Sequence, residues 1–115
     1  TIDAEASLGE LDWALYEQLQ LVEPCGHANE RPVLLARDLK VVAHRVVGAD
    51  GYHLKLSVTD GRTFFDAIAF RQGRLADQMP ARVDLAFTLD ANEWNGERRL
   101  QLNVVDLRPA NEEGT

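Results

Sequence analysis

Apolar and polar residues alternate with a period of two from Leu39 onward, and this alternation limits the folds open to the chain. In the clearest run, "RVDLAFTLD", four apolar residues share one face: Val83, Leu85, Phe87 and Leu89. The residues between them share the other face: Asp84, Ala86, Thr88 and Asp90. This is the pattern of a strand with one buried face. The sheet must therefore close on itself or pack one face against something else.

Tight turns separate these runs. The tripeptides "ADG" (49–51), "TDG" (59–61) and "WNG" (94–96) contain Asp-Gly or Asn-Gly, which tolerate the positive φ of a hairpin turn. We predict strands at 39–47, 52–59, 63–70, 82–90 and 98–107. The segment "RQGRLADQM", between the third and fourth strands, is predicted to form a short helix.

Three strands, a helix and two strands follow one another in the order of a five-stranded Greek-key barrel, the OB-fold. A small barrel needs apolar residues only on its inner face, which fits the half-polar alternation. We therefore predict a mainly β protein with an OB-fold barrel and a short helix after strand three. Another small α+β sheet is the alternative.

An amphipathic α-helix is predicted before the barrel, in "SLGELDWALYEQLQLVEPCG". Ser7 and Glu10 have the spacing of a capping box, and Pro24 and Gly26 end the helix. Its apolar stripe consists of Leu8, Leu11, Leu15, Leu19 and Val22. The stripe must bury against the barrel or against a domain outside this chain. We expect a helix and linker at 1–30, the OB domain at 31–108 and a flexible polar tail at 109–115.

The net charge of −7 is unevenly distributed. Residues 1–30 hold seven acidic residues and no Lys or Arg, and residues 109–115 hold two more acidic residues. All 12 Lys and Arg lie in 31–108, against ten acidic residues, so this middle segment carries +2. Such asymmetry permits the middle segment to bind nucleic acid.

No catalytic or metal-binding motif is evident. His27, His44 and His53 lack metal-ligand spacing with each other or with Cys25, and there is no phosphate-binding glycine loop or nucleophile elbow. We expect no catalytic residue, metal or cofactor in this chain. Asp60 is predicted to be a turn residue, and Asp66 a partnered polar residue at the barrel rim.

The chain is also expected to be cytoplasmic and monomeric. A lone Cys25, predicted to be a buried inert thiol, fits a reducing compartment. No stretch reaches the roughly 18–20 apolar residues of a membrane helix, so no membrane partner is expected.

OB-folds bind oligonucleotides on strands two and three and in the loops that join strands one to two and four to five. Single-stranded nucleic acid requires cations along the phosphates and flat groups on which bases stack. The candidate binding residues at these positions are Arg45, His53, Lys55, Arg62, Trp94, Arg98 and Arg99.

Each candidate has a structural alternative. Lys55 and Arg62 fit a solvated surface equally well, and Arg98 and Arg99 could pair with Asp90 or Glu93 across the hairpin. Trp94 could pack against the barrel end instead of stacking on a base. Two further aromatic residues are predicted to pack in the core: Tyr52 and Phe64.

The sequence resembles a known family. "HLKLSVTDGRTFFDAIAF" and "RVDLAFTLDANEWNGERRLQL" are similar to the C-terminal OB domain of RecJ, the bacterial single-stranded-DNA-specific 5′→3′ exonuclease family. Upstream, "IDAE" and "SLGEL" resemble the lead-in to this domain, and "EPCGHANERPV" resembles the family's "EPFGxGNPxPV". This segment departs from the family at Cys25, Ala28 and Glu30. The resemblance covers about residues 2–108.

The resemblance implies that the chain is one domain of a larger enzyme. The family's nuclease site consists of DHH and DHHA1 motifs that bind Mn²⁺ or Mg²⁺, and none of these motifs is in this chain. The implied function is to bind single-stranded DNA for the nuclease core during recombination and repair. The alternative is a structural or protein-interaction module that closes the nuclease ring or recruits a repair partner.

Overall fold

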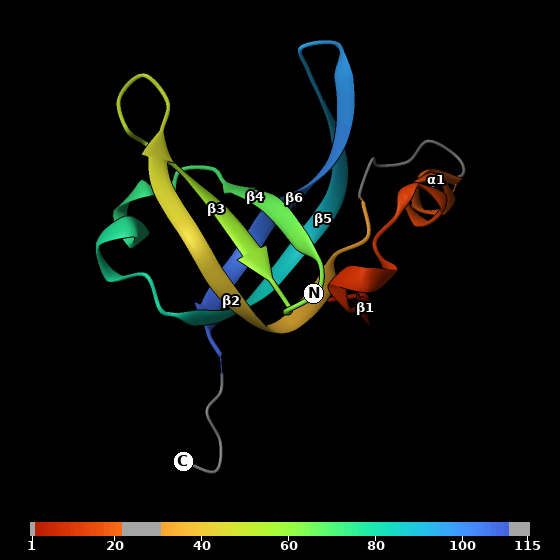
Figure 1. The fold of residues 1–115 in the computed structure, drawn as a ribbon, viewed down its shortest axis with the longest axis horizontal. Helices are drawn as coiled ribbons and strands as arrows, with labels where there is room; N and C mark the ends of the chain where they lie inside the picture. Colours follow the sequence, from red (N-terminus) through yellow and green to blue (C-terminus); the bar gives the residue numbers. More distant parts are fainter. Residues whose placement is uncertain (1, 22–30, 111–115) are drawn as a thin grey trace.

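The computed structural model describes residues 2–21 and 31–110, with short helices flanking a strand-rich centre (Figure 1). The N-terminal elements are β1 (Ala4–Glu5), the 3₁₀ helix η1 (Leu8–Glu10) and α1 (Trp13–Leu21). The remaining elements are β2 (Leu34–Val47), β3 (His53–Thr59), β4 (Phe64–Ala69), the 3₁₀ helix η2 (Gly73–Gln78), β5 (Arg82–Trp94) and β6 (Glu97–Pro109).

Five of the strands close into a barrel. The sheet order is β1-β2-β3-β4-β6-β5, and an additional pairing between β2 and β5 joins its two sides. All neighbours in the barrel are antiparallel except β4 and β6, which are parallel. This closed, mainly β architecture confirms the predicted OB-fold, with η2 as the short helix after the third barrel strand.

Three barrel strands extend beyond their predicted bounds, β6 by one residue at its start and two at its end. β2 begins at Leu34, five residues before the predicted start, because Leu34 and Leu35 pair with Phe87 and Ala86 of β5. β5 continues to Trp94, opposite Glu97 of β6, so the last hairpin projects from the barrel (Figure 1). The predicted turn is formed by Asn95 and Gly96, both with positive φ.

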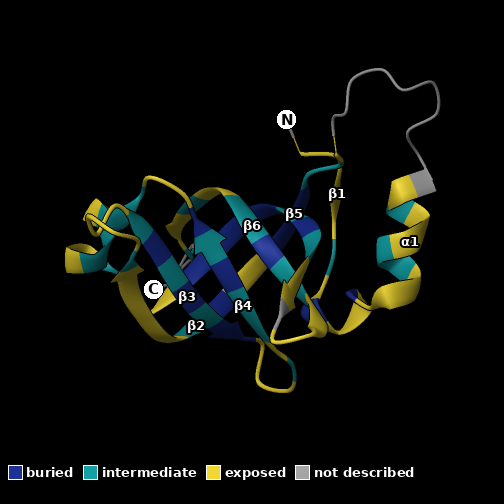
Figure 2. Ribbon diagram, turned by 90° about the horizontal axis from the view of Figure 1, so that it is seen from above, coloured by how far each residue is buried: buried dark blue, intermediate teal, exposed yellow. Residues whose placement is uncertain are grey.

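The barrel core contains the predicted inward-facing residues of β3 and β5, which appear dark blue in Figure 2. The fully buried ones are Leu54, Leu56, Val58, Val83, Leu85 and Phe87. Asp84 and Ala86 are on the other face of β5 from the core residues, as predicted, but both are buried and not solvated. Ile2 and Leu35 line a small hollow together with them.

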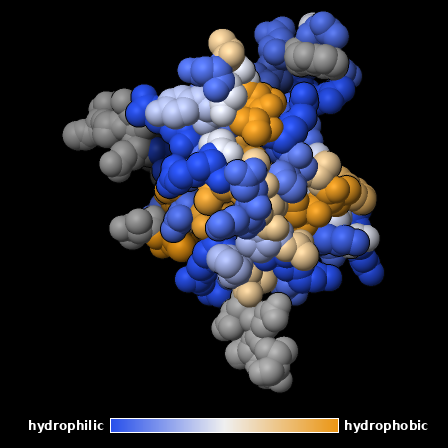
Figure 3. Space-filling view, turned by 90° about the vertical axis from the view of Figure 1, so that its left-hand side faces the viewer, coloured by the Kyte–Doolittle hydropathy of each residue, from blue (hydrophilic) through white to orange (hydrophobic). Residues whose placement is uncertain are grey.

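The end of the barrel with η2 and the β2–β3 loop faces the viewer in Figure 3. Hydrophobic side chains form separate orange patches among blue hydrophilic ones. Exposed apolar residues of this region include Val46, Tyr52 and Phe70. The prediction that Tyr52 packs in the core was wrong, because Tyr52 precedes β3 and its ring lies 5.5 Å from that of His53.

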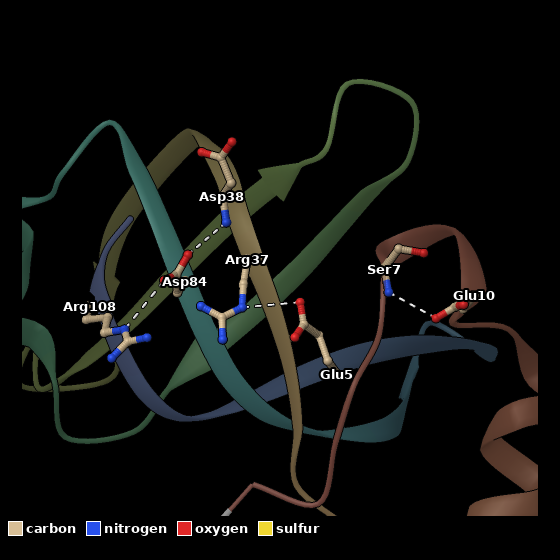
Figure 4. Close-up of polar contacts among 7 residues, drawn as sticks. All are labelled: Glu5, Ser7, Glu10, Arg37, Asp38, Asp84 and Arg108. Atoms are coloured by element: carbon tan, nitrogen blue, oxygen red, sulfur yellow. Dashed lines mark hydrogen bonds and ion pairs between the residues drawn. The ribbon is translucent and has the colours of Figure 1, made fainter. Parts of the chain in front are cut away.

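Asp84 stabilises an irregularity in β2 (Figure 4). The β2–β5 register shifts between Ala36 and Leu39, and Asp38 adopts a φ of 55°. The Asp38 N–H donates to Asp84 Oδ1 over 2.8 Å, and Arg108 Nε lies 3.4 Å from Asp84 Oδ2. These partners explain why a carboxylate can be buried here, since an unpartnered one would be costly.

The N-terminal helix starts later than predicted. α1 begins at Trp13, where Asp12 Oδ1 accepts the Leu15 N–H over 2.9 Å, rather than at Ser7. Ser7 N–H donates to Glu10 Oε1 over 3.0 Å, but this contact belongs to η1 (Figure 4). Within the described residues, no helix is long and apolar enough to cross a membrane.

The predicted apolar stripe packs on the barrel at its N-terminal end. Leu8 and Leu11 join the buried barrel cluster, whereas Leu15 and Leu19 are only half-buried against it. Figure 2 shows α1 standing beside the barrel with most of its surface exposed. The predicted stripe residue Val22, the helix end at Pro24 and the predicted tail beyond Ala110 lie outside the described residues.

Candidate nucleic-acid interface

The candidate site lies on the outer face of β2, β3 and β4. Arg45 of β2 is opposite Lys55 of β3, which is opposite Ile68 of β4. Lys55 alternates with Leu54 and Leu56, whose side chains fill the core. Because side chains alternate between the two faces of a strand, Lys55 must point outward.

A hollow of about 240 Å³ on this face brings together side chains from all five barrel strands. It is lined by Arg45, Lys55, Asp66, Asn92, Arg99, Leu100 and Gln101. We call it the cationic hollow. Three of the predicted binding residues, Arg45, Lys55 and Arg99, therefore meet at one place although they are far apart in the sequence.

The three cations of the cationic hollow differ from one another in their partners. Within the described part of the chain, neither Arg45 nor Lys55 forms an ion pair, and Arg99 has Glu97 3.5 Å away. Elsewhere on the barrel, Arg37 pairs with Glu5 and Arg82 with Asp38, whereas Arg62, Arg71 and Arg74 form no ion pair within the described residues. The hollow is therefore distinguished by the convergence of its cations and not by a lack of ion pairs.

Asp90, one alternative partner for Arg98 and Arg99, has contacts with other residues. Asp90 instead accepts from Arg31 over 2.7 Å and from Asn103 Nδ2 over 2.8 Å. Arg98 places its guanidinium carbon 4.8 Å from the ring centroid of Trp13, at the start of α1. The hairpin and α1 are thus in contact through a cation–π pair.

A second hollow, of about 370 Å³, surrounds this contact. It is lined by Trp13, Phe64, Phe65, Asp66, Arg98, Arg99 and Leu100. We call it the aromatic hollow. The prediction that Phe64 packs in the core was wrong, because 64% of its surface is exposed. Its shared face with Asp66 was the signal, since a carboxylate on one face of a strand indicates that this is the outer face.

Trp13 is a residue of this hollow that the sequence reasoning missed. α1 was expected to present an apolar stripe and a solvated acidic face, and Trp13 belongs to neither. Its position depends on how α1 lies against the hairpin, which no local pattern records. Trp13 also contacts Tyr16 in a T-shaped arrangement, with ring centroids 5.5 Å apart.

Of the remaining predicted residues, Arg62 and His53 lie away from these hollows. Arg62 is in the turn between β3 and β4, at the opposite end of β3 from His53. His53 Nδ1 accepts the Arg71 N–H over 2.9 Å, and its ring lies 5.2 Å from that of Phe70. Trp94 ends β5 at the hairpin tip, but its side chain lies outside the described part of the structure.

Two carboxylates behave as predicted. Asp60 Oδ1 accepts the N–H groups of Thr63 and Arg62, each over 2.9 Å, and these hydrogen bonds hold the pKa of Asp60 below its usual 3.8. Asp66 Oδ1 accepts from Ser57 Oγ over 3.2 Å. The turn role of Asp60 and the partnered state of Asp66 are confirmed.

No group of three or more His, Cys, Asp or Glu in residues 2–21 and 31–110 is placed to hold a metal ion. His44 has a structural contact, since its Nε2 lies 3.1 Å from the Ala76 carbonyl oxygen. Cys25 and His27 lie outside the described residues.

Comparison with known proteins places the chain in a family. The family model described as the RecJ OB domain matches residues 2–106. The chain is 34% identical over 111 residues to the single-stranded-DNA-specific exonuclease RecJ of Dickeya dadantii, covering 93% of this chain and 19% of that protein. It is 33% identical over 94 residues to the RecJ of Thermus thermophilus, covering 82% of this chain and 13% of that protein.

A solved structure agrees. The crystal structure of Thermus thermophilus RecJ in complex with Mn²⁺ matches with a TM-score of 0.65 and 30% sequence identity, over 84% of this chain and 14% of that one. The chain thus spans less than a fifth of the length of these two RecJ relatives. With the closed barrel and the family match over residues 2–106, the chain belongs to the RecJ OB domain family.

Proposed function

We propose that this chain is a single-stranded-DNA-binding domain that holds a DNA strand for the nuclease core of a RecJ-like exonuclease. The observation that carries the proposal is the cationic hollow, where Arg45, Lys55 and Arg99 converge on the outer barrel face. Its position on the face where OB-folds bind oligonucleotides supports the same function.

The charges of the hollow suggest how the strand lies. Arg45 and Lys55 would contact phosphates, because both are cations of the hollow and neither forms an ion pair within the described residues. Asp66 lines the same hollow and repels phosphates. We therefore expect a base rather than a phosphate beside Asp66, where the carboxylate can accept a hydrogen bond from an exocyclic amino group.

Fluorescence anisotropy with labelled single-stranded and duplex oligonucleotides tests the proposal. Single strands should bind better, and binding should weaken as salt rises, because phosphate contacts release counterions. Lys55→Ala removes one such contact and should reduce the slope of log K against log salt by about 0.7. Arg82→Ala is the matched control. Like Lys55→Ala it removes one positive charge, but the arginine that is lost is paired with Asp38.

Equal affinity for single strands and duplexes, with no dependence on salt, would contradict DNA binding. So would an Arg82→Ala slope that falls as much as that of Lys55→Ala.

In the proposed setting, the whole protein is a cytoplasmic recombination and repair exonuclease whose Mn²⁺ or Mg²⁺ is bound outside this chain. NMR shifts that appear only after addition of the nuclease core, and not with DNA, would favour the alternative of a structural module.

A further inference from the structure

We propose that the DNA path leaves the barrel at Phe64 and reaches α1, where one base stacks in the aromatic hollow beside Trp13. This inference rests on the proposed function and extends it. It assigns a DNA-contacting role to the N-terminal helix, outside the barrel surface that OB-folds ordinarily use.

The two hollows are adjacent. Asp66, Arg99 and Leu100 line both of them, so a strand in the cationic hollow reaches the aromatic hollow by passing these three side chains. Phe64 is two residues from Asp66 on the same face of β4. That step is about 7 Å along the strand, so the aromatic surface begins directly beside the hollow.

The chemistry of the aromatic hollow suits one nucleotide. Trp13 and Phe64 are aromatic residues that are 37% and 64% exposed. Arg98 extends from the hairpin to the Trp13 ring, and its guanidinium is close enough to contact a phosphate of the same nucleotide. Aromatic rings beside a cation are the combination that binds single strands without base specificity.

The path should end at Trp13. Asp12 precedes it and Glu17 follows on α1, both exposed, and no Lys or Arg occurs in residues 1–30. A phosphate beyond Trp13 would therefore meet negative charge. A protein ligand fits this hollow less well, because Arg98 and Arg99 interrupt its apolar lining.

Binding of the full 115-residue chain to oligothymidylates of about 4 and about 16 nucleotides tests this path, since these lengths bracket the site sizes of OB-folds. Trp13→Ala should weaken binding of the longer strand about 5- to 150-fold and leave the shorter one nearly unchanged. Trp13→Phe should retain most of the affinity, and Phe64→Ala should resemble Trp13→Ala. Val105→Ala is the control, because it removes an exposed apolar side chain that lines neither hollow.

Fluorescence supplies a second readout. Trp94→Phe leaves Trp13 as the single tryptophan, and stacking of a thymine should quench its emission when the longer strand binds. The inference would be overturned if Trp13→Ala bound with unchanged affinity and the Trp13 emission of Trp94→Phe were not quenched. Trp13 would then have only the structural role of holding α1 in place. If Lys55→Ala still weakens binding in that case, the proposed function stands. If the unmodified chain binds no single strand, both fail.

Discussion

At the scale of single residues, the turns follow from local chemistry. Asp60 accepts hydrogen bonds from backbone groups two and three residues ahead, and Asn95 and Gly96 adopt the positive φ that Asn-Gly tolerates. These interactions involve neighbours in sequence only. Such turns are therefore readable from the sequence without knowledge of the barrel.

The hydrogen bonds of Asp60 make its contribution to stability depend on pH. They lower its pKa in the folded state, so the stabilisation is complete above the ordinary value of 3.8 and is lost as pH falls through the folded value. Asp60→Ala should therefore lower Tm at about pH 7, with a difference that shrinks in acid. Thermal unfolding followed by circular dichroism at several pH values measures this. A difference that stays constant down to about pH 2 would contradict it.

At the scale of elements, η2 is placed by direct contact with backbone. The Gly73 N–H donates to the Tyr52 carbonyl oxygen over 3.0 Å. A Cβ on Gly73 would lie 2.7 Å from the carbonyl oxygen of Gly51, closer than such atoms can approach. The glycine therefore lets η2 lie against the loop between β2 and β3.

Two glycines in short 3₁₀ helices allow a matched test of this contact. Gly73→Ala should lower the free energy of unfolding by about 1–3 kcal/mol, because the added methyl group must displace backbone. Gly9→Ala in η1 should be nearly neutral, since the nearest atom to its Cβ would be Thr63 Oγ1 at 4.0 Å. Urea denaturation of both variants gives the values. Equal losses in the two variants would show that the loop contact is not the cause.

At the scale of the whole molecule, the N-terminal segment and the barrel share one core. Ala6 N–H donates to Leu35 O over 2.9 Å, and β1 pairs with β2 in parallel. Leu8 is completely buried within the barrel cluster. We infer that the segment up to Leu11 folds together with the barrel, although the sequence suggested a helix and linker of 30 residues.

Truncation of Leu8 tests this shared core. Leu8→Ala should cost about 2–5 kcal/mol, the usual loss for a buried leucine. Leu19→Ala, in the half-buried part of α1, should cost clearly less because part of that side chain is already in water. Chemical denaturation of both variants measures the two losses in the free energy of unfolding. If Leu8→Ala cost no more than Leu19→Ala, the N-terminal segment would be an appendage of the barrel.

The same division between local and long-range information separates what was predicted from what was not. The period of two identified the strands and the inward residues such as Leu85 and Phe87, because side-chain direction alternates along any strand. The exposure of Phe64 and the burial of Asp84 were missed. The burial of Asp84 depends on neighbours from distant segments, and the exposure of Phe64 depends on the lack of such neighbours.

By itself, the sequence determined the element order, the turns, the barrel class and the family resemblance. All of these depend on patterns within a few residues or on direct similarity. Only the tertiary structure decided that Arg45, Lys55 and Arg99 share one hollow and that Trp13 lies beside Arg98. These residues come together because β2 pairs with β5 to close the barrel and α1 lies beside the hairpin. Barrel closure and helix placement are set by the summed packing of distant residues, which no local pattern encodes.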